Sequence, residues 1–248
     1  MISPLAYVDA SAKLGANVTV HPFAYIDKNV EIGDDCEIMP HVSIMSGTRM
    51  GKRNRIFNGA VIAAEPQDFN YKGDDTIVEI GDDNVIRENV VINRATNSGG
   101  KTVIGNGNFL HEGVHVSHDT HIGNHSVFGY GSKISGNCMI EDYVIFGGNV
   151  LVSQGCRVGT WSMTQTGCRF RKDVPPYIVA ALEPTTYYGV NSVILMHEGM
   201  SEKIVKHISH AYRIIYQGNA SIFDALLMID EIQHIIDFIS ASKLGIIK

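Results

Sequence analysis

Five of the eleven histidines of the chain lie within one stretch, HEGVHVSHDTHIGNH, at residues 111–125. Imidazole side chains can hold zinc, act as general bases near neutral pH, or occupy ordinary surface positions. His118 is followed directly by Asp119, a carboxylate suited to orienting or polarising the ring. The stretch lacks the HExxH spacing that would place two histidines on one helix face. The elements that carry these residues therefore decide between the three interpretations.

A hydrophobic residue recurs at every sixth position through most of the chain. The series runs from Ile2 to Ile62, resumes at Ile80 and again at Ile104, and closes at Phe170. This period differs from the 3.6 residues of a helix and from the alternation of a strand. It is the signature of hexapeptide β-helices. Small or short side chains often follow four positions after the large one, as at Ala60, Val114, Thr120 and Ser126.

The repeat predicts a mainly β fold, a parallel β-helix. Each hexad supplies a short strand and a turn, three hexads make one coil, and residues 18 apart in the sequence stack on neighbouring coils. Stacked coils bury a continuous hydrophobic core inside a narrow prism. Two polar segments, 65–76 and 95–102, interrupt the repeat without changing its phase. We expect both to loop out from the prism and to serve function, because loops on a regular scaffold commonly carry binding and catalytic residues.

The C-terminal part follows a helical pattern. Ser201 is a candidate N-cap for a helix over 202–217, and a second helix is expected around 221–240. We therefore divide the chain into a β-helix domain, 1–191, and a helical domain, 192–248. The first helix carries basic side chains that form either a solvated face or a cradle for an acidic partner protein, namely Lys203, Lys206, His207, His210 and Arg213.

The composition is that of a soluble protein, with a formal net charge of −6. This charge argues against a nucleic-acid partner, because phosphate contacts need a basic surface. We see no secretory signal and no apolar run that approaches the roughly 20 residues needed to span a bilayer. The cysteines, Cys36, Cys138, Cys156 and Cys168, form no CxxC pair, so we expect packed, reduced thiols and a cytoplasmic location.

The repeat also places the histidines. His115 comes directly before the inward-facing Val116 and His118 two positions after it, so both should project outward at one corner of the prism. His121 belongs to the next face. Some β-helix trimers of the gamma-class carbonic anhydrase type bind zinc with histidines from two subunits, so a zinc site across an interface is one alternative. A non-catalytic scaffold is another.

Specific stretches extend this interpretation, namely EPQDFNY, IGDDNVIRENVVINRAT, GVHVSHDTHIGN, KDVPPYIVA and YYGVN. In order and spacing, the whole chain resembles the UDP-N-acetylglucosamine 3-O-acyltransferase family, which carries out the first step of lipid A biosynthesis. The resemblance implies a left-handed parallel β-helix with a C-terminal helical domain, assembled as a homotrimer. It also implies transfer of an R-3-hydroxyacyl chain from acyl carrier protein to the 3-hydroxyl of UDP-N-acetylglucosamine, without a metal or other cofactor beyond the donor's phosphopantetheine.

The chemistry needs a base for the sugar hydroxyl, which is worth roughly 10²–10⁴-fold, and an N–H donor for the oxyanion. By the resemblance, His118 is the base, Asp119 its neighbour, and Gly136 the glycine whose N–H faces the thioester carbonyl. Gly136 follows His118 by 18 residues, so the two should stack. The resemblance further implies substrate contacts at Asp68, His115, Asn137, Gln154 and Asn191. The depth of an apolar cleft should set the acyl length, and we expect Met163 and its stacked neighbours to line it.

Four residues depart from the family pattern. Asn70 stands where a lysine is frequent, Asn137 and Ser153 where histidines occur, and His197 where an arginine is frequent. Each change weakens anion binding. The departures leave open a 3-amino sugar nucleotide as the acceptor, and an acetyl-CoA-dependent sugar acetyltransferase remains a rival on the same fold.

Overall fold

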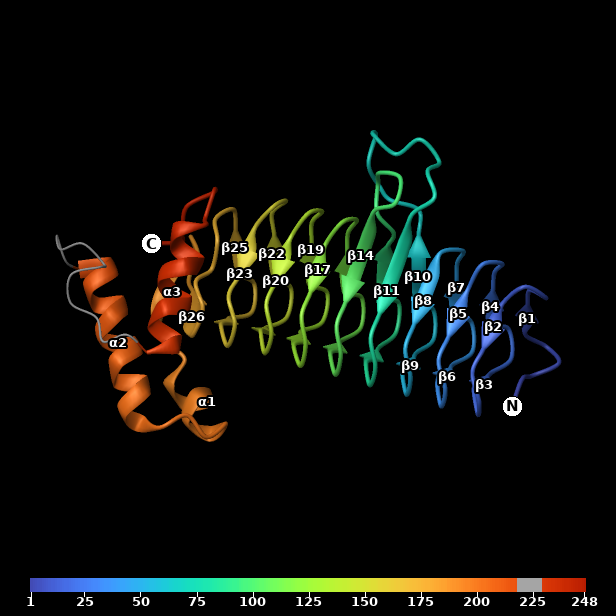
Figure 1. The fold of residues 1–248 in the computed structure, drawn as a ribbon, viewed down its shortest axis with the longest axis horizontal. Coiled ribbons are helices and arrows are strands. Elements are labelled where there is room, and N and C mark those ends of the chain that lie inside the picture. Colours follow the sequence, from blue (N-terminus) through green and yellow to red (C-terminus); the bar gives the residue numbers. More distant parts are fainter. Residues whose placement is uncertain (218–228) are drawn as a thin grey trace.

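The computed structural model describes residues 1–217 and 229–248. Within these residues, short strands coil into a long prism with three sheets, parallel except for the last strand pair of one sheet, and helices gather at its C-terminal end (Figure 1). We call the sheets A, B and C and name each corner by the two sheets that it joins. Along the sequence, the chain passes from sheet B through the B–C corner to sheet C, and then through the C–A corner to sheet A.

Sheet B contains the strands β1 (Tyr7–Val8), β4 (Tyr25–Ile26), β7 (Ser43–Ile44), β10 (Val61–Ala64), β13 (Val91–Asn93), β16 (His115–Val116), β19 (Lys133–Ile134), β22 (Leu151–Val152) and β25 (Arg169–Phe170). Sheet C contains β2 (Lys13–Leu14), β5 (Glu31–Ile32), β8 (Thr48–Met50), β11 (Ile77–Ile80), β14 (Lys101–Ile104), β17 (His121–Ile122), β20 (Met139–Ile140) and β23 (Arg157–Val158). Sheet A contains β3 (Thr19–Val20), β6 (Glu37–Ile38), β9 (Arg55–Ile56), β12 (Val85–Ile86), β15 (Phe109–Leu110), β18 (Val127–Phe128), β21 (Ile145–Phe146), β24 (Met163–Thr164), β26 (Ile178–Ala181) and β27 (Thr186–Val190).

The register follows the predicted coil. Val116 pairs with Ile134, and Ile134 with Val152, so residues one coil apart differ by 18 in number. Two coils are longer, because Ile62 pairs with Ile92 and Ile92 with Val116. The extra residues form the loops 65–76 and 95–100, which both project from the B–C corner (Figure 1). The second loop is shorter than predicted, because Lys101 and Thr102 belong to β14 and pair with β11.

The core consists of the predicted hexad residues. From Val20 onward their large side chains point inward and are nearly inaccessible, as Ile26, Ile62 and Val116 illustrate, whereas Ile2 at the open end of the prism is 52% exposed. The small residues four positions later, such as Ala60 and Ser126, are also fully buried. Period six therefore predicts the buried positions correctly from Val20 to Phe170, including Thr164, the polar member of the series, but not Ile2, which has no preceding coil to pack against.

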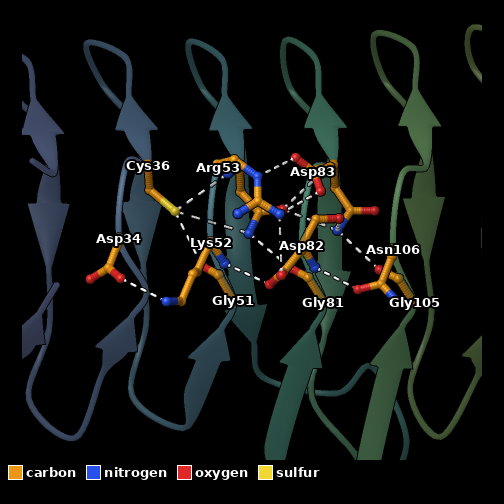
Figure 2. Close-up of polar contacts among 12 residues, drawn as sticks. Asp34, Cys36, Gly51, Lys52, Arg53, Gly81, Asp82, Asp83, Gly105 and Asn106 are labelled. Carbon is orange, nitrogen blue, oxygen red and sulfur yellow. Dashed lines mark hydrogen bonds and ion pairs between the residues drawn. The ribbon is translucent and has the colours of Figure 1, made fainter. Parts of the chain in front are cut away.

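The C–A corner is closed by a ladder of side chains. Asn124 accepts a hydrogen bond through Oδ1 from the N–H of Asn106 at 2.8 Å, and Asn106 accepts one from the N–H of Asp82 at 2.8 Å. Figure 2 shows the earlier part of this ladder, where the N–H of Lys52 donates to Asp82 Oδ1 at 2.8 Å. Five backbone N–H groups of this corner therefore gain a side-chain acceptor from the next coil, which satisfies polar groups that strand pairing leaves over, namely those of Ala16, Lys52, Asp82, Asn106 and Asn124.

The helical end packs on the prism. It contains α1 (Ser192–His197), α2 (Glu202–Gln217) and α3 (Asp230–Ser240). Ser201 Oγ accepts a hydrogen bond from the N–H of Ile204 at 3.4 Å, as expected for the predicted N-cap. The second predicted helix begins within residues outside the described part of the chain, so its first half stays a prediction. None of the described helices is long and apolar enough to cross a bilayer.

The basic face predicted for α2 is partly engaged within the helix itself. Lys206 pairs with Glu202 at 2.7 Å, and Arg213 hydrogen bonds with His210 Nδ1 at 2.6 Å. Helix α3 contacts the prism through His234, whose Nε2 lies 2.8 Å from Glu141 Oε2. Arg157 also reaches α3, donating to the carbonyl of Phe238 at 3.1 Å.

Candidate functional site

His118 occupies the B–C corner, directly after β16 and between the two projecting loops. Its side chain points out from the prism, as predicted, but the loops cover it, and the residue is only 7% exposed. Asp68 comes from the first loop and Thr96 from the second. The loops thus turn an exposed corner into a sheltered site, where hydrogen bonds are stronger than they are in water.

Both ring nitrogens of His118 have partners. Nδ1 lies 2.9 Å from Asp119 Oδ2 and 3.0 Å from Thr96 Oγ1, whereas Nε2 lies 3.5 Å from Asp68 Oδ2. A carboxylate can only accept, so the short contact with Asp119 favours a proton on Nδ1. The lone pair of the neutral ring then lies on Nε2, facing Asp68.

The backbone fixes Asp119 in place. Its φ of 58° belongs to the left-handed region, which Asp tolerates better than most residues. Its N–H donates to Thr102 Oγ1 at 2.9 Å, and its Oδ2 accepts the N–H of Thr96 at 3.1 Å. The carboxylate that orients His118 is therefore itself anchored to the second loop.

Gly136 lies one coil beyond His118, and the imidazole ring rests on its backbone. A Cβ at this position would come within 2.5 Å of His118 Cε1 and 2.6 Å of Nε2. Only glycine permits this approach. The N–H of Gly136 has no hydrogen-bond acceptor among residues 1–217 and 229–248, so a donor is left available beside Nε2.

His115 has a separate role in the same region. Its Nε2 lies 2.6 Å from Oδ1 of the buried Asn93, and Asn93 Nδ2 donates to the carbonyl of Glu65 at 2.6 Å. This chain of contacts ties β16 to the first loop. Burial, followed by the nearby charge of Lys133, lowers the pKa of His115 below its ordinary value. Both effects favour the neutral form of His115.

The other histidines of the stretch point to different places. His111 packs against Phe109, His125 stacks on Tyr143 with ring centroids 5.2 Å apart, and His121 lies on the outer face of sheet C. Across the described ranges, no three His, Cys, Asp or Glu side chains converge as metal ligands would. The five histidines thus contribute one catalytic candidate, one supporting residue and surface positions.

The remaining predicted site residues fall into two groups. Gln154 and Asn137 lie on the same B–C corner as His118, one or two coils further on, and both are exposed. Met163 and Asn191 do not join them within one chain. Met163 belongs to sheet A, and Asn191 is buried beyond β27, where its Nδ2 donates to the carbonyl of Trp161 at 3.0 Å.

The cysteines do not supply a nucleophile. All four are buried and unpaired in the described structure, as predicted. Burial raises the pKa of Cys138 to about 11 and that of Cys156 to about 12. The thiolate is the reactive form, and it is therefore scarce at neutral pH.

The sequence did not point to Thr96 or Asn93. The repeat identified the second loop as a functional candidate, but not which of its side chains reaches His118. Periodicity locates residues on the prism and carries no information on the path of a loop between two strands. Asn93 ends β13, two positions after Val91, which is the register partner of His115, so the register alone did not point to it.

This arrangement defines the class of the protein, a hexapeptide-repeat β-helix with a histidine–aspartate pair at one corner. A sequence profile described as bacterial transferase hexapeptide (six repeats) matches residues 101–136. A second profile, described as UDP-N-acetylglucosamine O-acyltransferase, domain 2, matches residues 173–247.

Full-length relatives give the family. The chain is 41% identical to an acyl-[acyl-carrier-protein]–UDP-N-acetylglucosamine O-acyltransferase from Xanthomonas axonopodis, over 98% of this chain and 96% of the relative. A solved UDP-N-acetylglucosamine acyltransferase from Bacteroides fragilis superposes with a TM-score of 0.98 at 49% identity and covers 100% of both chains. The corresponding structure from Acinetobacter baumannii gives a TM-score of 0.96 at 32% identity, over 100% of this chain and 99% of the other.

The chain belongs to the acyl-[acyl-carrier-protein]–UDP-N-acetylglucosamine O-acyltransferase family, and it is an O-acyltransferase. The predicted class, a mainly β parallel β-helix with a small C-terminal helical part, is confirmed. Family membership sets aside the carbonic-anhydrase-like, acetyl-CoA-dependent and scaffold alternatives.

Proposed function

We propose that this protein transfers an R-3-hydroxyacyl chain from acyl carrier protein to the 3-hydroxyl of UDP-N-acetylglucosamine, the first step of lipid A biosynthesis. The observation that carries the proposal is His118, held by Asp119 through Nδ1, with its ring against the backbone of Gly136, whose N–H has no acceptor among the described residues. The family relatives named for this reaction support the choice of donor and acceptor.

The reaction follows from this geometry. His118 Nε2 takes the proton of the sugar 3-hydroxyl as its oxygen attacks the thioester carbonyl carbon. The imidazolium that forms is stabilised by Asp119, which also keeps the ring in the required tautomer. Collapse of the tetrahedral intermediate breaks the C–S bond, and the proton passes to the departing thiolate. A base of this kind contributes roughly 10²–10⁴-fold.

Gly136 stabilises the oxyanion. We assign the oxyanion donor to the N–H of Gly136, and a preorganised donor at such a centre contributes roughly 10²–10³-fold. Asp68 is positioned to accept hydrogen bonds from sugar hydroxyls, because its Oδ1 is already engaged by the N–H of Asn70 at 2.8 Å while Oδ2 faces the site. His115, Asn137 and Gln154 complete the sugar-nucleotide site along the same corner.

The working form is a homotrimer with sites between subunits. The outer face of sheet A carries an apolar column suited to packing against a neighbouring prism, formed by Val85, Phe109, Val127, Ile145 and Met163. Sheet C instead presents charged side chains such as Glu31 and Arg49. A neighbour packed on sheet A would bring Met163, for the acyl chain, and Asn191, for the nucleotide, to the His118 of another subunit.

We further propose a division into an acyltransferase domain, residues 1–191, and a helical domain, residues 192–248, in a protein of the cytoplasm. The division is supported by the end of the prism at β27 and the start of α1 at Ser192. No cofactor takes part beyond the phosphopantetheine of the donor, because base, oxyanion donor and thioester suffice for acyl transfer.

The test is acyl transfer from 3-hydroxyacyl carrier proteins of several chain lengths, with a metal chelator present. UDP-N-acetylglucosamine and its 3-amino analogue serve as parallel acceptors. We expect transfer to the hydroxyl sugar, unaffected by the chelator, and the preferred length follows from the same series. Transfer to the amino analogue alone would replace the proposed acceptor, and loss on chelation would contradict the metal-free mechanism.

A further inference from the structure

A basic cavity lies at the C-terminal end of the prism, beside β25. Its volume is about 570 Å³. Among the described residues that line it, the cationic side chains Arg169, Arg171, Lys172 and Lys248 stand against the single carboxylate side chain of Glu183. This local excess of positive charge occurs in a chain whose formal net charge is −6.

Among the described residues, three cations of this cavity have no carboxylate partner. In the described part of the chain, Arg169, Arg171 and Lys172 form no ion pair, and all three are exposed. The hydroxyl-bearing Thr185 and Thr186 also line the cavity. Guanidinium and ammonium groups that converge without a carboxylate partner favour an anionic ligand, above all a phosphate.

The position of Lys172 relates this cavity to the active site. Four residues each come two positions after an inward-facing residue of sheet B, namely His118, Gly136, Gln154 and Lys172. Those inward residues are successive ladder partners, Val116, Ile134, Val152 and Phe170. Lys172 therefore lies three coil steps from His118 along one corner, about 14 Å at ~4.8 Å per step.

We propose that this cavity binds the phosphodiester at the base of the carrier protein's phosphopantetheine arm; the inference rests on the proposed function. The arm has about thirteen bonds between its sulfur and its phosphorus, which span about 15 Å when extended at peptide-like bond lengths. With the thioester at His118 and Gly136, the phosphodiester reaches the Lys172 step. In UDP-N-acetylglucosamine about five bonds, or ~6 Å, separate the 3-oxygen from the nearer phosphorus, so its diphosphate falls short of the cavity.

The first experiment compares Michaelis constants. In the double variant Arg171→Ala/Lys172→Ala, we expect KM for the acyl carrier protein donor to rise about tenfold or more. KM for the sugar nucleotide and kcat at saturating donor should stay within about twofold of the wild type. Lys28→Ala, which removes an exposed cation at the other end of the prism, is the matched control, and Lys172→Arg should retain most of the donor affinity.

The second experiment separates the phosphate from the carrier protein's surface. The wild type should use acyl-phosphopantetheine better than acyl-pantetheine, and the double variant should lose that preference. Equal use of the two free arms by the wild type would overturn the proposal, as would an unchanged donor KM or a rise confined to the sugar nucleotide.

A binding titration with holo-carrier protein and phosphate-free apo-carrier protein keeps the test independent of turnover. Wild type should bind the holo form more tightly, and the double variant should bind both alike. If transfer fails altogether while this difference persists, the proposed reaction is wrong and the cavity assignment stands. If transfer proceeds and the difference is absent, only the cavity assignment is wrong.

Discussion

Two corners of one prism show how the same backbone position serves structure or chemistry. At the C–A corner, Asn124 uses its side chain to accept the N–H of Asn106 from the preceding coil. At the B–C corner, Gln154 holds the equivalent position one coil after Gly136, yet the Gly136 N–H has no acceptor among the described residues and the ring of His118 lies against its backbone. The C–A corner thus uses its N–H groups for stability, whereas the B–C corner leaves the Gly136 N–H free, within the described part of the chain, near the proposed base, His118.

The largest expected effect that tests this comparison comes from Gly136→Ala. The added Cβ meets the His118 ring at 2.5 Å, so ring and amide cannot keep their positions. We expect kcat to fall about 10²–10³-fold, as for the loss of an oxyanion donor. The matched control is Gly148→Ala, where a Cβ would meet the exposed ring of Tyr130 at the same 2.5 Å. Steady-state kinetics beside melting temperatures should show similar destabilisation but activity lost only at position 136.

A second, smaller effect is expected from Asp119→Asn. An amide can donate to Nδ1 of His118, which would move the ring proton to Nε2 and remove the base. We expect kcat to fall by at least about tenfold, with less change in KM for either substrate. A variant whose kcat and pH–rate profile both match the wild type would show that Asp119 does not position the ring.

Disrupting the ladder of the C–A corner should lower stability without lowering activity. Asn106→Ala removes the acceptor of the Asp82 N–H and one rung of the ladder. The free energy of unfolding should fall by about 1 kcal/mol, while kcat stays unchanged. Urea denaturation and the transfer assay on the same preparation measure both. A large loss of activity would mean that the two corners are not functionally separate.

The smallest expected effect concerns the docking of α3. The hydrogen bond to Glu141 raises the pKa of His234. Asp237 and Arg157 are the other charged groups facing this ring. The contact's contribution to stability is complete below the unfolded pKa of about 6.5 and is lost as the pH rises through the raised folded value.

Melting temperatures of the wild type and His234→Gln, measured across this window, should differ most at acidic pH and converge at alkaline pH. The difference should be small, because the His234 side chain is 39% exposed and solvent screens the pair. A gap between the two proteins that widens with rising pH would have the wrong sign for this account.

The sequence predicted the prism well because one geometric rule governs it. Period six identified inward residues such as Ile62 and Thr164, and the 18-residue coil stacked Gly136 on His118. The contacts of Asp68 and Thr96 could not be predicted, because they depend on loop paths that no repeat constrains. Likewise Met163 and Asn191 lie away from His118 within one chain, so their assignment came from the family resemblance and needs an assembly.

The most direct test of the central claim compares two histidines of one stretch in the transfer assay. His118→Ala removes the proposed base, whereas His121→Ala removes a ring from the outer face of sheet C, three residues later in the sequence. Single-turnover rates should fall roughly 10²–10⁴-fold for the first variant and stay within about twofold for the second. Undiminished transfer by His118→Ala, in folded protein, would contradict the assignment of the B–C corner as the active site.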